Sequence, residues 1–270
     1  MMIAAVLYPV EAFRWDMLAM TKPTVIYRKK GRVAHVVLNR PTTGNAIDQS
    51  MAYGLQDAAR SMTEDDDVAV GIIRGTGDAF CNGSDPLTPP TDTLPSRRVA
   101  QALAEVPKPT IAAINGDALG QGLEIALACD LRIVVQGARL GMDQVRRGEM
   151  PWDGGTQRLP RLAPRGTAME MILLGLLLTA EEAYTLGLVM EVVAGNELEK
   201  RCDELAQQLA SAAPLANTYA REALHKGMDM PLDQALRLEA DLAILLHTSP
   251  DRAEGLKAFL EKRAPNFTGG

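Results

Sequence analysis

The sequence predicts an α/β fold in which most strands pair in parallel. Short, continuous apolar runs that suit buried strands, such as residues 68–75 and 109–115, alternate with stretches of helical periodicity. Chains with this alternation fold as a parallel sheet covered by helices. With 270 residues, the chain is long enough to bury a sizeable core.

After residue 20, the chain opens with a predicted hairpin and helix. β-rich segments at 25–28 and 33–38 flank a Lys-Gly turn. Apolar residues then recur at helical spacing over 51–62, behind Asp48, a residue type that caps helix N-termini. The first elements therefore have the order β-β-α.

The later core elements keep the alternation of strand and helix. They are a strand at 68–75, a loop at 78–86, an irregular Pro- and Thr-rich segment at 86–95, a helix at 97–106, a strand at 109–115, a helix at 122–128 and a strand at 131–135. This order favours parallel pairing, because parallel strands need a crossover connection between them.

Strand signals thin out after residue 167. One remains at 187–193, and Thr179 with Glu182 forms a capping-box pattern. The helical candidates that follow are at 196–211, 215–227, 232–248 and 250–263. We therefore expect a mixed core that ends near Pro214, followed by a helical tail.

Composition and charge exclude several classes of protein. A net charge of −6 argues against a nucleic-acid or anionic-membrane surface, although a local basic pocket for a small anion stays open. No run approaches the roughly twenty uncharged apolar residues of a membrane span. The three cysteines are too far apart for a disulfide framework or a CxxC knuckle, so we expect a cytoplasmic location. The three histidines lack partners at metal-ligand spacing, and we expect no metal site.

The segment "NGDALGQGLEIALACD" places a glycine turn and one carboxylate at the head of an apolar helix. It matches neither a dinucleotide fingerprint nor a P-loop. The turn at Gly120-Gln121 leaves unpaired amides and the positive end of a helix dipole facing one spot, a seat for an oxygen with negative charge. Glu124 follows Gln121 by about one helical turn. The alternatives are that Glu124 only complements the dipole and that the glycines only allow close packing.

A second glycine turn, at Gly83-Ser84-Asp85, also follows a predicted buried strand. By itself it would be an ordinary Asn-Gly turn. Two such turns after neighbouring parallel strands would offer two converging amide donors, as an enolate-stabilising hole requires.

The chain resembles the crotonase family, also called the enoyl-CoA hydratase/isomerase family, over residues 24–267. The motifs that carry the resemblance are "LNRPTTGNAI", "GTGDAFCNGSD", "KPTIAAINGDALGQGLEIALACDLRI", "DGGTQRLPRL", "TAEEAYTLGLVMEVV" and "AFLEKRAPNF". The resemblance implies a spiral of ββα units at 21–213 and a helical trimerisation domain at 214–270. Residues 1–20 carry Glu11, Arg14 and Asp16 and lack a basic leader, so we expect this segment to be a poorly ordered N-terminal extension rather than a signal peptide.

The resemblance also implies a ligand and a hole. The ligand is an acyl-CoA thioester, with coenzyme A as part of the substrate and no tightly bound cofactor. The protein is expected to form a homotrimer or a dimer of trimers, without nucleic acid or membrane as partner. The backbone amides of Ser84 and Gln121 form the oxyanion hole, so the departures from the commoner Ala and Gly side chains need not abolish it.

The acid/base pair departs from the family pattern. Glu124 matches the first of the two glutamates of the family's hydratases, but Gln144 stands at the second, and a neutral amide cannot shuttle a proton. The substitute carboxylates are Asp143, Glu149 and Asp153. We favour Asp153, in the loop that lines the acyl pocket in this family; the alternative is that it caps the following segment.

Further residues are placed by resemblance around the ligand. The coenzyme A-binding candidates are Thr42, Gly83, Asp85, Gly120, Phe259 and Lys262, with Lys262 reaching a neighbouring subunit's ligand. The alternatives are a solvated helix face for Lys262 and core packing for Phe259, and Trp152 either walls the acyl group or packs in the core.

Three functions remain open from the sequence. The first is hydration or dehydration of an α,β-unsaturated acyl-CoA. The second is another crotonase chemistry, either isomerisation with one carboxylate or hydrolysis of a CoA ester. The third is a non-catalytic acyl-CoA-binding protein; Gln144 favours the second and third, while the glycine turns and Glu124 argue against the third.

Overall fold

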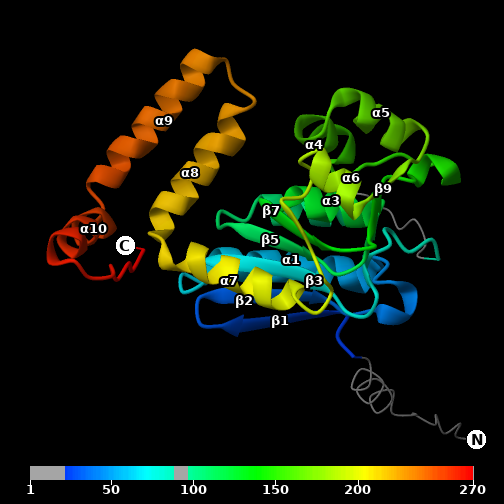
Figure 1. The fold of residues 1–270 in the computed structure, drawn as a ribbon, viewed down its shortest axis with the longest axis horizontal. Helices are drawn as coiled ribbons and strands as arrows, with labels where there is room; N and C mark the ends of the chain where they lie inside the picture. The colour runs from blue at the N-terminus through cyan, green and yellow to red at the C-terminus, as the bar shows by residue number, and fades with distance from the viewer. Residues whose placement is uncertain (1–21, 88–96, 270) are drawn as a thin grey trace, which may run out of the picture.

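The computed structural model describes residues 22–87 and 97–269 and contains two sheets with helices around them (Figure 1). The larger sheet has six strands in the order β1-β2-β3-β5-β7-β10. Its strands are β1 (Val25–Lys30), β2 (Val33–Leu38), β3 (Val70–Gly75), β5 (Thr110–Ile114), β7 (Leu131–Val135) and β10 (Glu191–Val193). All neighbours pair in parallel except the β1–β2 hairpin.

The smaller sheet has four strands of three residues each, in the order β4-β6-β8-β9. They are β4 (Ala79–Cys81), β6 (Asp117–Leu119), β8 (Arg139–Gly141) and β9 (Leu177–Thr179). β4, β6 and β8 pair in parallel, and β9 joins β8 antiparallel. Each of these three parallel strands follows a strand of the larger sheet, which makes the repeating unit of the expected ββα spiral.

Helices complete each turn of the spiral and then form the tail. They are α1 (Gln49–Glu64), α2 (Val99–Ala104), α3 (Gln121–Ala128), α4 (Gly155–Leu162), α5 (Arg165–Leu173), α6 (Ala180–Thr185), α7 (Leu198–Ser211), α8 (Pro214–Gly227), α9 (Leu232–His247) and α10 (Pro250–Glu261). Two short 3-10 helices, η1 (Pro41–Thr43) and η3 (Gln144–Arg147), complete the elements used below.

Local sequence signals explain several of these elements. The Asp48 side chain accepts a hydrogen bond from the Met51 amide at 2.8 Å and starts α1, as predicted. The capping box at Thr179 and Glu182 is present at the start of α6. Burial in the larger sheet rises from its edge to its centre: no residue of the edge strand β1 is fully buried, whereas every residue of β5 is buried, as its continuous apolar run predicts.

The helical tail begins with α8 at Pro214 and buries little. Figure 1 shows that α9 returns alongside α8 and leads into α10, and that the three helices stand to one side of the sheets. Arg221 of α8 ties them to the core through its ion pair with Asp130, at 2.8 Å. None of the helices in the described ranges is long and apolar enough to cross a bilayer.

Two expectations concern segments that the structure does not describe. The predicted N-terminal extension at 1–20 and most of the irregular segment at 86–95 lie outside the described residues. β4 lies within residues 78–86, where a loop was predicted, and the other three strands of the smaller sheet had no prediction, because three residues carry no periodic signal.

Candidate active site

Two glycine turns lie against each other at the carboxyl ends of neighbouring strands. β4 leads into Gly83-Ser84, and its parallel neighbour β6 leads into Gly120-Gln121. Gly83 has φ of 92° and Gly120 has φ of 53°, values that side chains disfavour. A Cβ atom at Gly83 would lie 3.5 Å from the Gln121 amide nitrogen, so the two turns meet through their main chains. Each turn was predicted to follow a long buried strand, at 68–75 or 109–115. In the structure a short strand of the smaller sheet, β4 or β6, lies between that strand and the turn.

The amides of Ser84 and Gln121 are both left out of secondary-structure pairing. In the parallel bridge to Ile47, the Ile47 amide donates to the Gly83 oxygen at 2.8 Å and the Asp85 amide donates to the Ile47 oxygen at 3.0 Å. The Ser84 amide therefore points to the other side of its strand. Gln121 is the first residue of α3, where an amide has no intrahelical acceptor. Neither amide donates to another described residue.

Close packing at Gly122 sets the position of α3. A Cβ atom there would lie 2.1 Å from the Cys81 carbonyl oxygen, far inside contact distance. The first turn of α3 therefore rests directly on the end of β4. This contact brings the start of the helix to the Ser84 turn. Gly122 therefore does allow close packing, as the alternative reading of the glycines predicted, and this packing also brings the two amides near each other.

Glu124 is fully buried next to these turns. Its Oε1 accepts hydrogen bonds from the amides of Asp153 and Gly155, both at 2.8 Å. Its Oε2 has one long contact, 3.4 Å to the amide nitrogen Nε2 of Gln144. Burial raises the pKa of the Glu124 carboxyl to about 7, against the opposing effect of the two backbone donors. One oxygen is thus held in place, and the other faces Gln144 with a proton affinity suited to exchange near neutral pH.

Two further oxygens beside the Gly120 turn are buried without a partner among the described residues. They are Oε1 of Gln144 and Oδ1 of Asp143. A Cβ atom at Gly120 would lie 3.5 Å from the Gln144 amide and 3.7 Å from Asp143 Oδ1. Asp143 uses its other oxygen for an ion pair with Arg147 at 2.8 Å. Buried acceptors without donors are uncommon, and here they gather around the predicted hole.

The structure corrects the role that the sequence favoured for Asp153. Its carboxylate accepts hydrogen bonds from the Ala100 amide at 2.8 Å and the Gln101 amide at 3.1 Å, at the start of α2. It also accepts one from Gln121 Nε2 at 3.1 Å. Burial raises the pKa of this carboxyl, but three donors occupy its oxygens. Asp153 is therefore a structural cap of α2, and a proton-transfer role is withdrawn.

The alternative considered for Asp153, a cap on the segment after it, is also wrong. α4 begins at Gly155 behind Gly154, which provides no side-chain cap. The Gly155 amide is taken by Glu124 instead. Asp153 supports this arrangement through its main chain, whose amide donates to Glu124 Oε1.

The remaining candidates near the site differ in exposure. Glu149 is exposed and lies 3.7 Å from Arg147 Nε, outside the buried group. Trp152 is half-buried, so its burial does not distinguish between a wall of the acyl pocket and packing in the core. Arg158, which the sequence did not single out, donates to the Asp153 carbonyl oxygen at 2.8 Å and brings a positive charge that lowers the pKa of Glu124.

The residues predicted to contact coenzyme A fall into two separate groups within one chain. Gly83 and Gly120 belong to the two turns, Thr42 is exposed on η1, and Asp85 pairs with Arg40 at 3.0 Å. Phe259 and Lys262 lie at the end of α10, on the far side of α8 from α3 in Figure 1. Phe259 is 80 % exposed, so core packing within its own chain is wrong.

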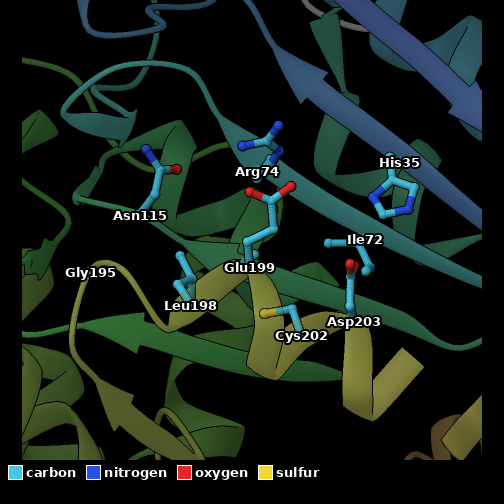
Figure 2. Close-up of a pocket in the computed structure, with 10 residues that line it drawn as sticks. His35, Ile72, Arg74, Asn115, Gly195, Leu198, Glu199, Cys202 and Asp203 are labelled. Atoms are coloured by element: carbon cyan, nitrogen blue, oxygen red, sulfur yellow. The ribbon is translucent and has the colours of Figure 1, made fainter. Parts of the chain in front are cut away.

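A separate pocket lies between α7 and the larger sheet (Figure 2). Its volume is about 110 Å³, and His35, Arg74, Cys202 and Asp203 are among its lining residues. Burial lowers the pKa of His35. The two glycine turns and Glu124 do not line this pocket, so it is distinct from the site described above. Within the described ranges, no group of three or more His, Cys, Asp or Glu side chains could hold a metal ion.

Comparison with known proteins places this chain in one family. The family model for enoyl-CoA hydratase/isomerase matches residues 28–270. The chain belongs to the enoyl-CoA hydratase/isomerase family.

Its relatives include an (E)-benzylidenesuccinyl-CoA hydratase of Thauera aromatica, with 40% identity over 88% of this chain and 96% of that protein. A crotonyl-CoA hydratase of Syntrophomonas wolfei is 35% identical over 92% of this chain and 99% of its own length. Among solved structures, an enoyl-CoA hydratase of Bacillus anthracis superposes with a TM-score of 0.87, at 35% identity, over 92% of this chain and 100% of that one. The expected ββα spiral with C-terminal helices is thereby confirmed.

Proposed function

We propose that the protein adds water reversibly across the α,β double bond of an acyl-CoA thioester. Several relatives bear the names of hydratases that act on unsaturated CoA esters. The observation that carries the proposal is a pair of buried acceptors, Glu124 Oε2 and Gln144 Oε1, beside the Gly120-Gln121 turn. A water molecule has two O–H donors for these two acceptors.

The thioester oxygen is assigned to the amides of Ser84 and Gln121. Adding a nucleophile at the β-carbon moves charge onto this oxygen, and two amides that have no other described acceptor stabilise it there. Removal of one such donor in other enzymes costs about 3 to 4 kcal/mol of transition-state stabilisation. The positive end of α3 adds to the effect.

The attacking water is assigned to a position beside Glu124 Oε2 and Gln144 Oε1. It donates one O–H to Glu124 Oε2 and the other to Gln144 Oε1, which leaves an oxygen lone pair to form the bond to the β-carbon. Glu124 takes the proton as that O–H bond breaks, and the π electrons of the double bond pass to the thioester oxygen as an enolate. Glu124 then returns the same proton to the α-carbon, so one water is consumed and the carboxylate is regenerated.

In this scheme Gln144 orients water and carries no proton. Glu124 alone takes and returns the proton, as its pKa of about 7 allows at neutral pH. A scheme with a second carboxylate would use Asp143 in place of Asp153, because the buried Oδ1 of Asp143 lies near the Gly120 turn.

A second function is supported by the neutral amide of Gln144. A single carboxylate that moves a proton from one carbon to another isomerises a double bond without water. Glu124 Oε2, which no backbone amide holds, fits that task as well. The hydrolase and the non-catalytic alternatives have no observation of their own in their favour.

The assembly and the location are also part of the proposal. Phe259 and Lys262 are assigned to the coenzyme A of a neighbouring subunit in a trimer or dimer of trimers, since α10 is remote from its own chain's turns. Thr42, Gly83, Asp85 and Gly120 are assigned to the coenzyme A of their own chain. The free thiols of all three cysteines support a cytoplasmic location.

The test is to incubate the protein with crotonyl-CoA and, separately, with a 3-enoyl-CoA, and to follow the absorbance of the conjugated thioester. Hydration predicts loss of absorbance with crotonyl-CoA. Isomerisation alone predicts a gain with the 3-enoyl ester and no change with crotonyl-CoA. Binding of CoA esters without either change would remove both proposals.

A further inference from the structure

The side chain of Gln121 connects three separate segments of the site. It is 1% exposed, and its Oε1 accepts a hydrogen bond from the Ser84 hydroxyl at 2.8 Å. Its Nε2 donates to the Arg97 carbonyl oxygen at 2.7 Å and to Asp153 Oδ2 at 3.1 Å. Both N–H groups of this amide are therefore used, and one residue links the Ser84 turn to the start of α2.

The strands beneath the two turns provide little to fix their separation. β4 and β6 have three residues each, and their pairing shifts register between Ala79 and Cys81. Short ladders with an irregular register hold their ends weakly. An extra connection between Ser84 and Gln121, directly at the two proposed donors, would compensate for this.

The connection also reaches the carboxylate. Asp153, which receives the Gln121 amide, donates its own main-chain amide to Glu124 Oε1 at 2.8 Å. Gln121, Glu124 and Asp153 are all at most 2% exposed. In a buried network of this kind each member restricts the others, and removing one leaves the remaining polar groups without partners.

We propose that Gln121 is a positioning residue whose side chain, bonded to Ser84 and Asp153, fixes the two amides of the hole relative to each other and to Glu124. The inference rests on the proposed function, because it gives the hole a thioester oxygen to stabilise. Gln121 thus has two separate roles: its main chain donates to the ligand, and its side chain sets the distance between the donors.

The experiment compares Gln121→Met, Ser84→Ala and the double variant. Methionine keeps the length of the side chain and removes its hydrogen bonds. Gln207→Met, on the exposed face of α7, is the matched control. Calorimetry measures binding of acetoacetyl-CoA, which can bind as an enolate, and of butyryl-CoA, which remains a neutral thioester. Thermal unfolding of each variant checks the fold.

The wild-type protein and the control should prefer the enolate ligand. We expect Gln121→Met to lower the affinity for acetoacetyl-CoA about tenfold and the affinity for butyryl-CoA much less. Hydrogen bonds to the negatively charged enolate oxygen are stronger than those to a neutral carbonyl, so binding of the enolate depends more on the positions of the two amides. Ser84→Ala should have a smaller effect of the same kind. In the Gln121→Met background, Ser84→Ala should add almost nothing, since its partner is already absent.

The failures of the two proposals are distinguishable. A wild-type protein with no preference for the enolate ligand would refute the hole and the proposed function with it. Three results would refute the positioning role and leave the hydratase proposal intact. Gln121→Met could keep the wild-type preference for the enolate ligand, the effects of the two substitutions could be additive, or affinity for both ligands could fall equally.

Discussion

Helices α3 and α8 show how differently the two parts of the chain are completed. All eight residues of α3 are buried, whereas none of the fourteen residues of α8 is. Around α3 the polar side chains of Gln121 and Glu124 bond within the same chain. In the tail, by contrast, large apolar side chains such as Ile244 and Phe259 are exposed. The core holds Glu124 and the two glycine turns by itself, and the tail presents an exposed apolar surface, which the proposed assembly would cover.

The largest effect is expected from a substitution in the buried helix α3. Glu124→Gln keeps the shape of the side chain and removes the base, so turnover of crotonyl-CoA should fall by about 10²- to 10⁴-fold with little change in ligand affinity. The exposed Glu149→Gln is the matched control and should behave like the wild type. Wild-type kinetics in Glu124→Gln would end the assignment of Glu124.

A second test uses glycines in two environments. Gly122→Ala would place a Cβ atom 2.1 Å from the Cys81 carbonyl oxygen, so α3 must shift away from β4 and both stability and turnover should fall. Gly166→Ala in α5 meets no atom within 4 Å and should be neutral or slightly stabilising, by at most about 1 kcal/mol. Thermal unfolding and the crotonyl-CoA assay report both. Equal behaviour of the two variants would contradict the close-packing role.

The tail can be tested by placing a charge on its apolar surface. Ile244 of α9 is 63 % exposed, and Ile244→Glu should dissociate an assembly that covers it, as light scattering after size exclusion would show. Gln234→Glu adds a charge at another exposed position of the same helix and serves as the control. An unchanged mass for Ile244→Glu would place the interface elsewhere.

The smallest expected effect is on stability against pH. The pKa of Glu124 is raised by burial to about 7 from 4.5, so the folded state retains this proton over a range in which the unfolded state has lost it. The contribution is present below about pH 4.5 and is lost as pH rises to about 7. Denaturant titrations across that range should show the free energy of unfolding of the wild type falling by about a few kcal/mol relative to that of Glu124→Gln. A constant difference would contradict the shift.

The strands of the larger sheet, most of the helices and the two turns could be predicted because their signals are local. Continuous apolar runs gave the larger sheet, and glycines gave the turns at Gly83 and Gly120. The network around them could not be predicted in this way. Asp153 caps a helix 53 residues earlier in the chain, and Ser84 meets Gln121 across 37 residues. Such contacts depend on how the spiral closes, and no spacing in the sequence encodes them.

The central claim is that the amides of Ser84 and Gln121 converge on one thioester oxygen. Isotope-edited infrared spectroscopy of butyryl-CoA labelled with ¹³C at its carbonyl measures this directly, since two donors polarise the C=O bond. We predict that the carbonyl band moves to lower wavenumber on binding, in the wild type and equally in Glu124→Gln, which keeps both amides. A bound ligand with the band at its solution position would contradict the account.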